Sequence, residues 1–389
     1  MSDVCAKHGA AYLAEHGSRM PQHHRRVLQL LADCGTGRLG SACYRCAPCL
    51  AAGKPHVHFT NASCGNRHCP GCQTSKNGDW CVQQTKKLLP CEYAFLTFTV
   101  PEQLRDFIRS NQSLCYDAMF RAAAFALRTC MAEPRICGAT TTGFTSVLHT
   151  FGGDLVYHPH IHVLMPCGGL DNDGHWTSTR PGFVVPVKKL SKEFREEFER
   201  LVGEEASACG VTSSDWRREF VSFAKPVGDG VATLKYLSRY MFRTAITNDR
   251  IVAIDETEVC FTYRKKSKKT QHDPSSRGSK SPLKAMRLPA MDFLRRFLQH
   301  VLPRGMQRVR HYGFHSRTSK MNLEALRSLI LQTMIDSEPD LELVEWTVPV
   351  LKPSRCESGG PLCPVCGSVL TFHTFIRIRP PPLEWRGRN

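Results

Sequence analysis

Two histidines separated by one hydrophobic residue are the feature of this sequence best suited to chemistry. They lie in an apolar run, Tyr157-His158-Pro159-His160-Ile161-His162-Val163-Leu164-Met165. Side chains alternate between the two faces of a β-strand, so His160 and His162 share one face and Ile161 points to the other. Imidazoles on one face can bind a divalent metal ion. The spacing therefore predicts a metal site on a strand whose opposite face joins the core.

A metal ion at this strand needs at least one further ligand. His149 lies on the strand expected to pair with the histidine strand, and His158 shares the face of His160 and His162. Buried polar groups need partners, so four imidazoles near one sheet face favour metal binding over packing. His149, His158 and a polar residue of the helix described next remain alternatives for the third ligand.

Two tyrosines, Tyr236 and Tyr240, lie on the helix expected at residues 231–245. Their i, i+4 spacing places both on one helix face. Core packing would explain them, because the helix also has an apolar stripe. However, Arg239 and Arg243 flank them, and cations would stabilise a phenolate and hold a scissile phosphate. Attack on DNA would give a 5′-phosphotyrosine and a free 3′-hydroxyl, with a metal polarising the phosphoryl oxygens.

Closely spaced cysteines predict a structural zinc site. Cys43-x2-Cys46 and Cys69-x2-Cys72 have nearly the spacing of a four-cysteine zinc module, in which Cys64 or His68 would be alternative ligands. Basic residues are interleaved with these cysteines, among them Arg67, so the module is expected to contact DNA phosphates, as are Arg239 and Arg243.

A second cysteine pair, Cys363 and Cys366, lies near the C-terminal end of the sequence. It is a candidate for a second zinc site, although a single Cys-x2-Cys pair is a weak signal. Its nearest further ligands in the sequence are Cys356 and His373.

Composition favours a globular protein with a polyanionic partner. The 389 residues include 41% hydrophobic residues, and 52 Lys and Arg against 35 Asp and Glu give a net charge of +17. Neutralised phosphates release counterions, so this excess favours nucleic acid. No apolar run reaches the length of a membrane span, and the first residues lack a secretory segment. We therefore expect a cytoplasmic protein whose 19 cysteines are reduced.

Hydrophobic periodicity predicts an α+β fold with an antiparallel sheet and flanking helices. Helices are expected at 22–33, 102–131, 191–206, 231–245 and 290–302, and strands at 93–100, 144–150, 160–165, 250–254 and 258–264. Four regions follow: a helical segment (1–33), a zinc-binding, DNA-contacting domain (34–88), a catalytic domain (89–270), and a basic, mixed C-terminal region (271–389).

The order of these motifs resembles the rolling-circle insertion-sequence transposases of the His-hydrophobe-His endonuclease superfamily, in the two-tyrosine type with an N-terminal zinc-binding domain. The resemblance covers about residues 20 to 370. It is carried by the motifs Cys34-Gly35-Thr36-Gly37-Arg38-Leu39-Gly40, Ser63-Cys64-Gly65-Asn66-Arg67-His68-Cys69-Pro70-Gly71-Cys72, Leu148-His149-Thr150-Phe151-Gly152, His158-Pro159-His160-Ile161-His162, Tyr236-Leu237-Ser238-Arg239-Tyr240 and Val309-Arg310-His311-Tyr312-Gly313.

The resemblance implies a bacterial enzyme that nicks one DNA strand at the end of a mobile element and moves a single-stranded copy. It implies subterminal hairpins and target DNA as partners and Mg²⁺ or Mn²⁺ as the catalytic metal, with His160 and His162 as ligands and Tyr236 and Tyr240 as nucleophiles. Gly65 and the segment His315-Ser316-Arg317 depart from the family pattern, which affects the expected DNA contacts.

Other functions share some of these features. A plasmid replication initiator or a relaxase would use the same strand and tyrosine chemistry, although many relaxases have the tyrosine upstream of the histidines. A zinc-dependent DNA-binding protein without catalysis would explain the charge and the cysteines, but it leaves the histidine strand and the paired tyrosines without a role.

Overall fold

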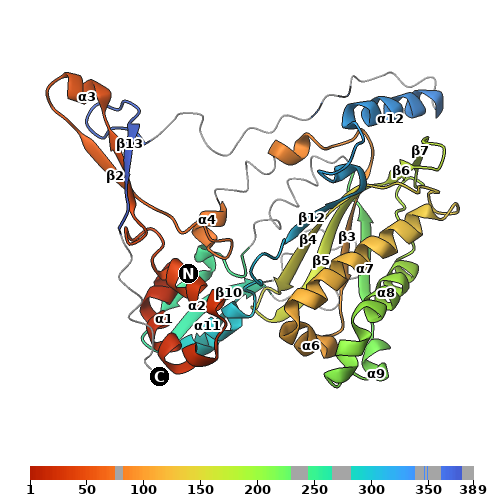
Figure 1. Cartoon of the computed structure of the whole chain (residues 1–389), viewed down its shortest axis with the longest axis horizontal. Helices are drawn as coiled ribbons and strands as arrows, with labels where there is room; N and C mark the ends of the chain where they lie inside the picture. Colours follow the sequence, from red (N-terminus) through yellow and green to blue (C-terminus); the bar gives the residue numbers. More distant parts are fainter. Residues whose placement is uncertain are drawn as a thin grey trace. The chain divides into compact units, whose positions relative to one another are not determined.

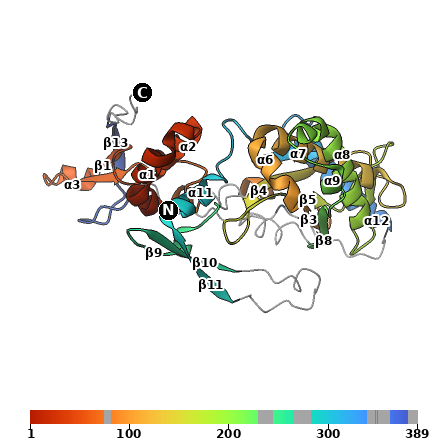
Figure 2. The ribbon, with the colours of Figure 1, turned by 90° about the horizontal axis from the view of Figure 1, so that it is seen from below.

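The computed structural model describes residues 1–74, 82–228, 244–264, 282–337, 346, 348 and 361–378. The chain forms two compact units (Figures 1 and 2). Unit 1 consists of Met1–Lys76, Phe242–Val301 and Pro353–Asn389, and unit 2 of Asn77–Met241 and Leu302–Lys352. Three separate segments of the chain therefore form unit 1.

The centre of unit 2 is a five-stranded antiparallel sheet in the order β12-β4-β5-β3-β8. The expected hairpin of the histidine strand with its upstream neighbour is confirmed, and β3 lies on the other side of that strand. The strands are β3 (Tyr93–Thr99), β4 (Phe144–Phe151), β5 (Tyr157–Pro166), β8 (Val221–Pro226) and β12 (Val309–Tyr312).

Helices cover one face of this sheet. The helix α7 (Gln112–Ala132) is rich in alanine, which favours a helix and lets it lie close to the strands. It ends just before Pro134, which disfavours helical backbone in the residue that precedes it. The helix α8 (Val187–Ala208) packs beside α7. The other elements of the unit are η2 (Glu102–Leu104), α6 (Arg105–Ser110), β6 (Gly168–Leu170), β7 (Trp176–Ser178), α9 (Ser213–Trp216), η5 (Gly313–His315) and α12 (Leu323–Ser337).

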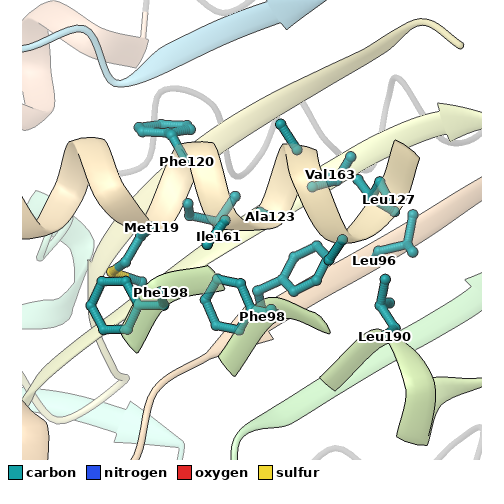
Figure 3. Packing of buried hydrophobic residues seen from close by; sticks show 14 of the residues in the cluster. Leu96, Phe98, Met119, Phe120, Ala123, Leu127, Ile161, Val163, Leu190 and Phe198 are labelled. Atoms are coloured by element: carbon teal, nitrogen blue, oxygen red, sulfur yellow. The ribbon is translucent and has the colours of Figure 1, made fainter. Parts of the chain in front are cut away.

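The main core lies between the sheet and these helices. Every second residue of the central strands enters it, including Phe98 from β3 and Ile161 from β5 (Figure 3). Ile161 is fully buried there, which confirms the expected alternation: the histidines on either side of it face away from α7 and α8.

Unit 1 contains two further antiparallel sheets, with strand orders β13-β1-β2 and β11-β10-β9. The strands expected at 250–254 and 258–264 are confirmed as β9 and β10, which pair as a hairpin, and β11 adds a third strand to it. The elements are α1 (Ser2–His16), η1 (Gly17–Arg19), α2 (Gln22–Ala32), β1 (Ser41–Arg45), α3 (Ala47–Ala51), β2 (Val57–Asn61), α4 (Pro70–Thr74), η3 (Asn248–Arg250), β9 (Ile251–Ile254), β10 (Glu258–Arg264), β11 (Leu283–Pro289), α11 (Ala290–Leu298) and β13 (Thr371–Ile376).

The expected α+β class with antiparallel sheets is therefore confirmed. The helix expected at 231–245 lies almost entirely outside the described residues. No helix in the described ranges is long and apolar enough to cross a membrane.

A pair of phenylalanine substitutions tests the core. Phe98 is fully buried between sheet and helices, whereas Phe125, on α7, is 44% exposed. We expect Phe98→Ala to lower the free energy of unfolding by about 3–5 kcal/mol, because it removes buried apolar surface and leaves a cavity. Phe125→Ala should change it by about 0.5 kcal/mol or less. Denaturant unfolding followed by tryptophan fluorescence measures both, and equal losses would contradict this placement of the core.

Candidate metal centre and cysteine clusters

Three histidines converge on the sheet face opposite α7 and α8. His149 of β4 lies directly across from His160 of β5, and His162 follows on the same face. One ring nitrogen of each lies within 4.8 Å of the others, and the ring centroids are 4.7 to 5.4 Å apart. Because imidazole nitrogens bind divalent transition metals, this group has a donor set that fits a metal ion.

A backbone carbonyl orients the ring of His160. The Nδ1 atom of His160 lies 2.7 Å from the carbonyl oxygen of His158. A carbonyl oxygen only accepts hydrogen bonds, so Nδ1 carries the proton and donates it. The lone pair that can bind a metal is therefore on Nε2.

The neighbouring strand β3 orients His162. Thr97 pairs with His162 in the sheet, and its Oγ1 lies 2.9 Å from His162 Nδ1. Phe95, two residues earlier on the same face, stacks on the imidazole with ring centroids 5.1 Å apart. Such partners usually fix the orientation of a metal-binding histidine. A role for Thr97 was not predicted from the sequence, because its contact with His162 joins residues 65 positions apart.

The structure distinguishes between the two histidines expected as third ligand. His149 is buried, stacks on Phe151, and presents its ring at nearly right angles to those of His160 and His162. His158 lies beside His160, but it is not part of the converging group. The geometry therefore favours His149 over His158 as the third metal ligand.

The other residues expected at the catalytic site lie outside the described residues. These are the two tyrosines, Tyr236 and Tyr240, and the two arginines of the same segment, Arg239 and Arg243. Their roles stay predictions.

Four thiols gather in the N-terminal part of unit 1: Cys34, Cys64, Cys69 and Cys72. The Sγ atoms of Cys34 and Cys72 are 3.7 Å apart, and those of Cys64 and Cys72 are 3.6 Å apart. A hydrogen bond from Cys64 lowers the pKa of Cys69 to about 5, which favours the thiolate that binds metal.

A second group of thiols joins two distant parts of the sequence: Cys46, Cys49, Cys363 and Cys366. Hydrogen bonds from Ser368 lower the pKa of Cys366 to about 6.

The grouping of the cysteines differs from the one that the spacing predicted. Cys46 groups with Cys49 and the C-terminal pair and not with Cys69 and Cys72. The group of Cys69 and Cys72 is completed by Cys34 and Cys64. Cys43 lies within β1 and is in neither group, and His68 is not in one either. The run Cys43-x2-Cys46-x2-Cys49 contains two overlapping Cys-x2-Cys pairs, so spacing alone could not select the pair that binds together.

The two departures from the family pattern have structural explanations. Gly65 has a φ of +60°, a backbone conformation that glycine adopts without strain. His315 is buried in unit 2, and desolvation lowers the pKa of its ring to about 3, so it is neutral at pH 7.

Arg67, which was expected to contact DNA phosphate, is half-buried, and burial lowers the pKa of its guanidinium.

Comparison with known proteins identifies two family regions in the chain. A family model described as "Transposase zinc-binding domain" matches residues 4–100, and one described as "Putative transposase" matches residues 143–322. The chain is 34% identical to "Putative transposase y4qJ" of Sinorhizobium fredii, over 99% of this chain and 98% of that protein. The chain belongs to the IS91 family of insertion-sequence transposases.

A second relative is the "Transposase for insertion sequence element IS801" of Pseudomonas savastanoi pv. phaseolicola, 28% identical over 78% of this chain and 73% of that protein. No solved structure matches the chain. As a transposase, the protein acts on DNA and has an endonuclease and strand-transfer activity. The histidine centre falls within the transposase match, whereas the first thiol group and half of the second fall within the zinc-binding match.

Metal affinity of the transposase tests the roles of His149 and Thr97. We expect His149→Ala to weaken Mn²⁺ binding at least about tenfold, because one donor is lost, and Thr97→Val to weaken it by about 10–100-fold, because His162 loses its orienting partner. His158→Ala is the matched control and should bind nearly as well as the wild type. Titration calorimetry with Mn²⁺ gives the three affinities. A loss confined to His158→Ala would contradict the assignment of His149.

Proposed function

We propose that this transposase nicks and rejoins single-stranded DNA at the ends of its insertion sequence, by rolling-circle transposition in a bacterial cell. The observation that carries the proposal is the convergence of His149, His160 and His162 on one sheet face, together with two tyrosines downstream in the sequence. A histidine centre alone fits many metalloenzymes. The tyrosines and the family's action on DNA narrow the chemistry to phosphoryl transfer.

The three imidazoles would hold Mg²⁺ or Mn²⁺. When bound, the ion supplies positive charge to the phosphoryl oxygens of the scissile phosphate. Three protein ligands leave coordination positions for those oxygens, as in other catalytic metal sites. The carbonyl oxygen of His158 would keep the ring of His160 oriented before DNA arrives, and the hydroxyl of Thr97 would do the same for His162.

A tyrosine hydroxyl would then attack the phosphorus. The new bond joins the tyrosine oxygen to phosphorus, and the bond from phosphorus to the 3′-oxygen breaks. The phenol loses its proton, and the departing 3′-oxygen takes one up as a hydroxyl. Because the ester keeps the energy of the broken bond, attack by another 3′-hydroxyl rejoins DNA without a nucleotide cofactor. With both tyrosines present, Tyr236 and Tyr240 would carry strand ends in turn.

The position of β8 supports a role for the downstream tyrosines. β8 is one of the two edge strands, two strands from the histidine strand, and it ends at Pro226. Neighbouring strands are about 4.8 Å apart, whereas a chain of about ten residues spans up to about 33 Å. The segment from Pro226 to Tyr236 is therefore long enough to bring the hydroxyl to the histidines.

The same edge strand offers a surface for unpaired bases. Phe223 pairs with Thr97 and Val221 with Thr99, so both lie on the histidine face. They are 44% and 46% exposed. Exposed aromatic rings stack on bases of single-stranded nucleic acid regardless of sequence, which favours single-stranded ends and hairpins, and target DNA, as substrates.

We also propose that Cys34, Cys64, Cys69 and Cys72 bind a structural zinc ion. Zinc–sulfur bonds of about 2.3 Å in a tetrahedron place sulfur atoms about 3.8 Å apart. The Sγ distances of 3.6 and 3.7 Å in this group agree with that value. Arg67, between Cys64 and Cys69 in the sequence, would contact DNA phosphate from this domain.

A covalent adduct tests the proposed chemistry. With Mn²⁺, the purified transposase should become linked to the 5′ side of a cleaved single-stranded oligonucleotide that carries the element end. Denaturing gel electrophoresis with label on either side of the cleavage site measures this. Folded protein that binds the oligonucleotide but forms no adduct would favour a non-catalytic DNA-binding protein, whereas cleavage only at a plasmid origin would favour a replication initiator.

Phenylalanine variants of the tyrosines test which hydroxyl attacks. Each of Tyr236→Phe and Tyr240→Phe keeps the ring but removes a nucleophile. If the two alternate, each variant should nick a single end but complete fewer strand transfers, and the double variant should form no adduct. Mass spectrometry of the peptide–DNA adduct identifies the linked residue. A double variant that still forms an adduct would exclude both tyrosines.

Removal of His160 tests the metal centre. His160→Ala should reduce nicking by at least about a thousandfold, because one donor to the ion that stabilises the transition state is lost. Binding of the oligonucleotide, measured by fluorescence anisotropy, should change little. His175→Ala, at an exposed histidine of the same unit, is the control. Full nicking by His160→Ala would rule out the centre.

A further inference from the structure

We propose that Cys46, Cys49, Cys363 and Cys366 bind a second structural zinc ion, whose site is complete only when the C-terminal segment returns to the N-terminal one. The ion would fasten β13 to β1 in the sheet β13-β1-β2. The inference is independent of the proposed catalytic chemistry, because it concerns residues of unit 1 alone.

The distances between the thiols fit one tetrahedral ion. The Sγ atoms of Cys46 and Cys366 are 3.4 Å apart, those of Cys49 and Cys366 are 3.5 Å apart, and those of Cys49 and Cys363 are 3.9 Å apart. These values lie near the edge of about 3.8 Å expected for four sulfurs around zinc. They are far longer than the bond of about 2.05 Å in a disulfide.

Each cysteine pair lies where the chain changes direction, with Cys46 just before the helix α3 and Cys49 inside it. On the N-terminal side, β1 ends at Arg45 and the helix α3 begins at Ala47, so the chain bends at Cys46. On the C-terminal side, the amide of Cys363 donates to the carbonyl of Ser368, and the amide of Gly367 donates to the carbonyl of Cys363. Gly367 has a φ of +72°, which permits the turn that folds Cys366 back toward Cys363.

The apolar packing around these thiols is too small to hold the segments together. The buried cluster contains one residue besides three of the four cysteines, namely Leu370, with Tyr44 packed against it. All six residues of β13 are exposed, although the strand pairs with β1 along its length. Small units with so little core usually depend on a metal ion or a disulfide. A zinc ion bound to four thiolates supplies that stabilisation, because binding and folding are coupled.

The zinc content of the full-length protein tests the inference. We expect two zinc ions per chain by plasma mass spectrometry of the wild type and one in the double variant Cys363→Ser, Cys366→Ser. The double variant Cys46→Ser, Cys49→Ser should lose the same single ion. Three controls should keep two ions: Cys43→Ser, the exposed Cys209→Ser, and His373→Ala on β13.

Alkylation of thiols tests whether the two halves share one ion. With zinc bound, Cys46→Ser should make Cys363 and Cys366 reactive toward iodoacetamide, although they are over 300 residues away, while Cys34 and Cys69 stay protected. Peptide mass spectrometry measures each site and also reports a general loss of folding, which would expose all of them. Cys363 and Cys366 that stay protected in Cys46→Ser, with two ions still bound, would overturn the inference.

Discussion

The pairing of β4 with β5 is the interaction on which the candidate catalytic centre depends. It sets His149 opposite His160, and the alternation along β5 then adds His162 to the same face. A shift of one residue would turn both β5 histidines into the apolar core and expose Ile161. Burial of Ile161 between the sheet and α7 therefore does more than stabilise unit 2: it selects the register that brings three imidazoles together. β5 is flanked on both sides, so β3 fixes the same register independently and supplies Thr97.

Unit 1 has buried apolar residues of its own, such as Leu28, Phe261 and Phe293, but its region around β13 is held together differently. Three separate stretches of sequence meet in it, and its sheet β13-β1-β2 has an N-terminal hairpin on one side and a strand from the far end of the chain on the other. Bringing such distant segments together has a high entropy cost, which the exposed side chains of β13 do little to offset. The thiols converge at this point. Unit 2 relies on buried apolar area, whereas this part of unit 1 would rely on the zinc ion proposed above.

The contrast between the units explains which features the sequence could predict. The histidine strand was predictable because its evidence is local: a period of two in an apolar run places two side chains on one face. The edge strands β8 and β12 were missed because each is short and buries little of one face. A helical segment was expected at 1–33, but the bounds of α1 within it were not predicted, because its buried stripe includes the polar His8 and the small Gly9. The cysteine grouping depends on pairing between β1 and β13, and Cys-x2-Cys spacing contains no information about which two pairs meet.

The donor sets indicate why one protein would contain two kinds of metal site. Four thiolates complete the tetrahedral coordination of zinc and leave no position for a substrate, so such a site can fold a domain but cannot activate a phosphate. Three imidazoles would leave positions open, and in this sheet they lie on the face opposite α7 and α8. The rigid strands keep these ligands in place without help from the metal, whereas the thiol-bearing turns have almost no apolar core of their own. We therefore expect unit 2 to keep its fold when its metal is removed, and the region around β13 to lose its fold when zinc is removed.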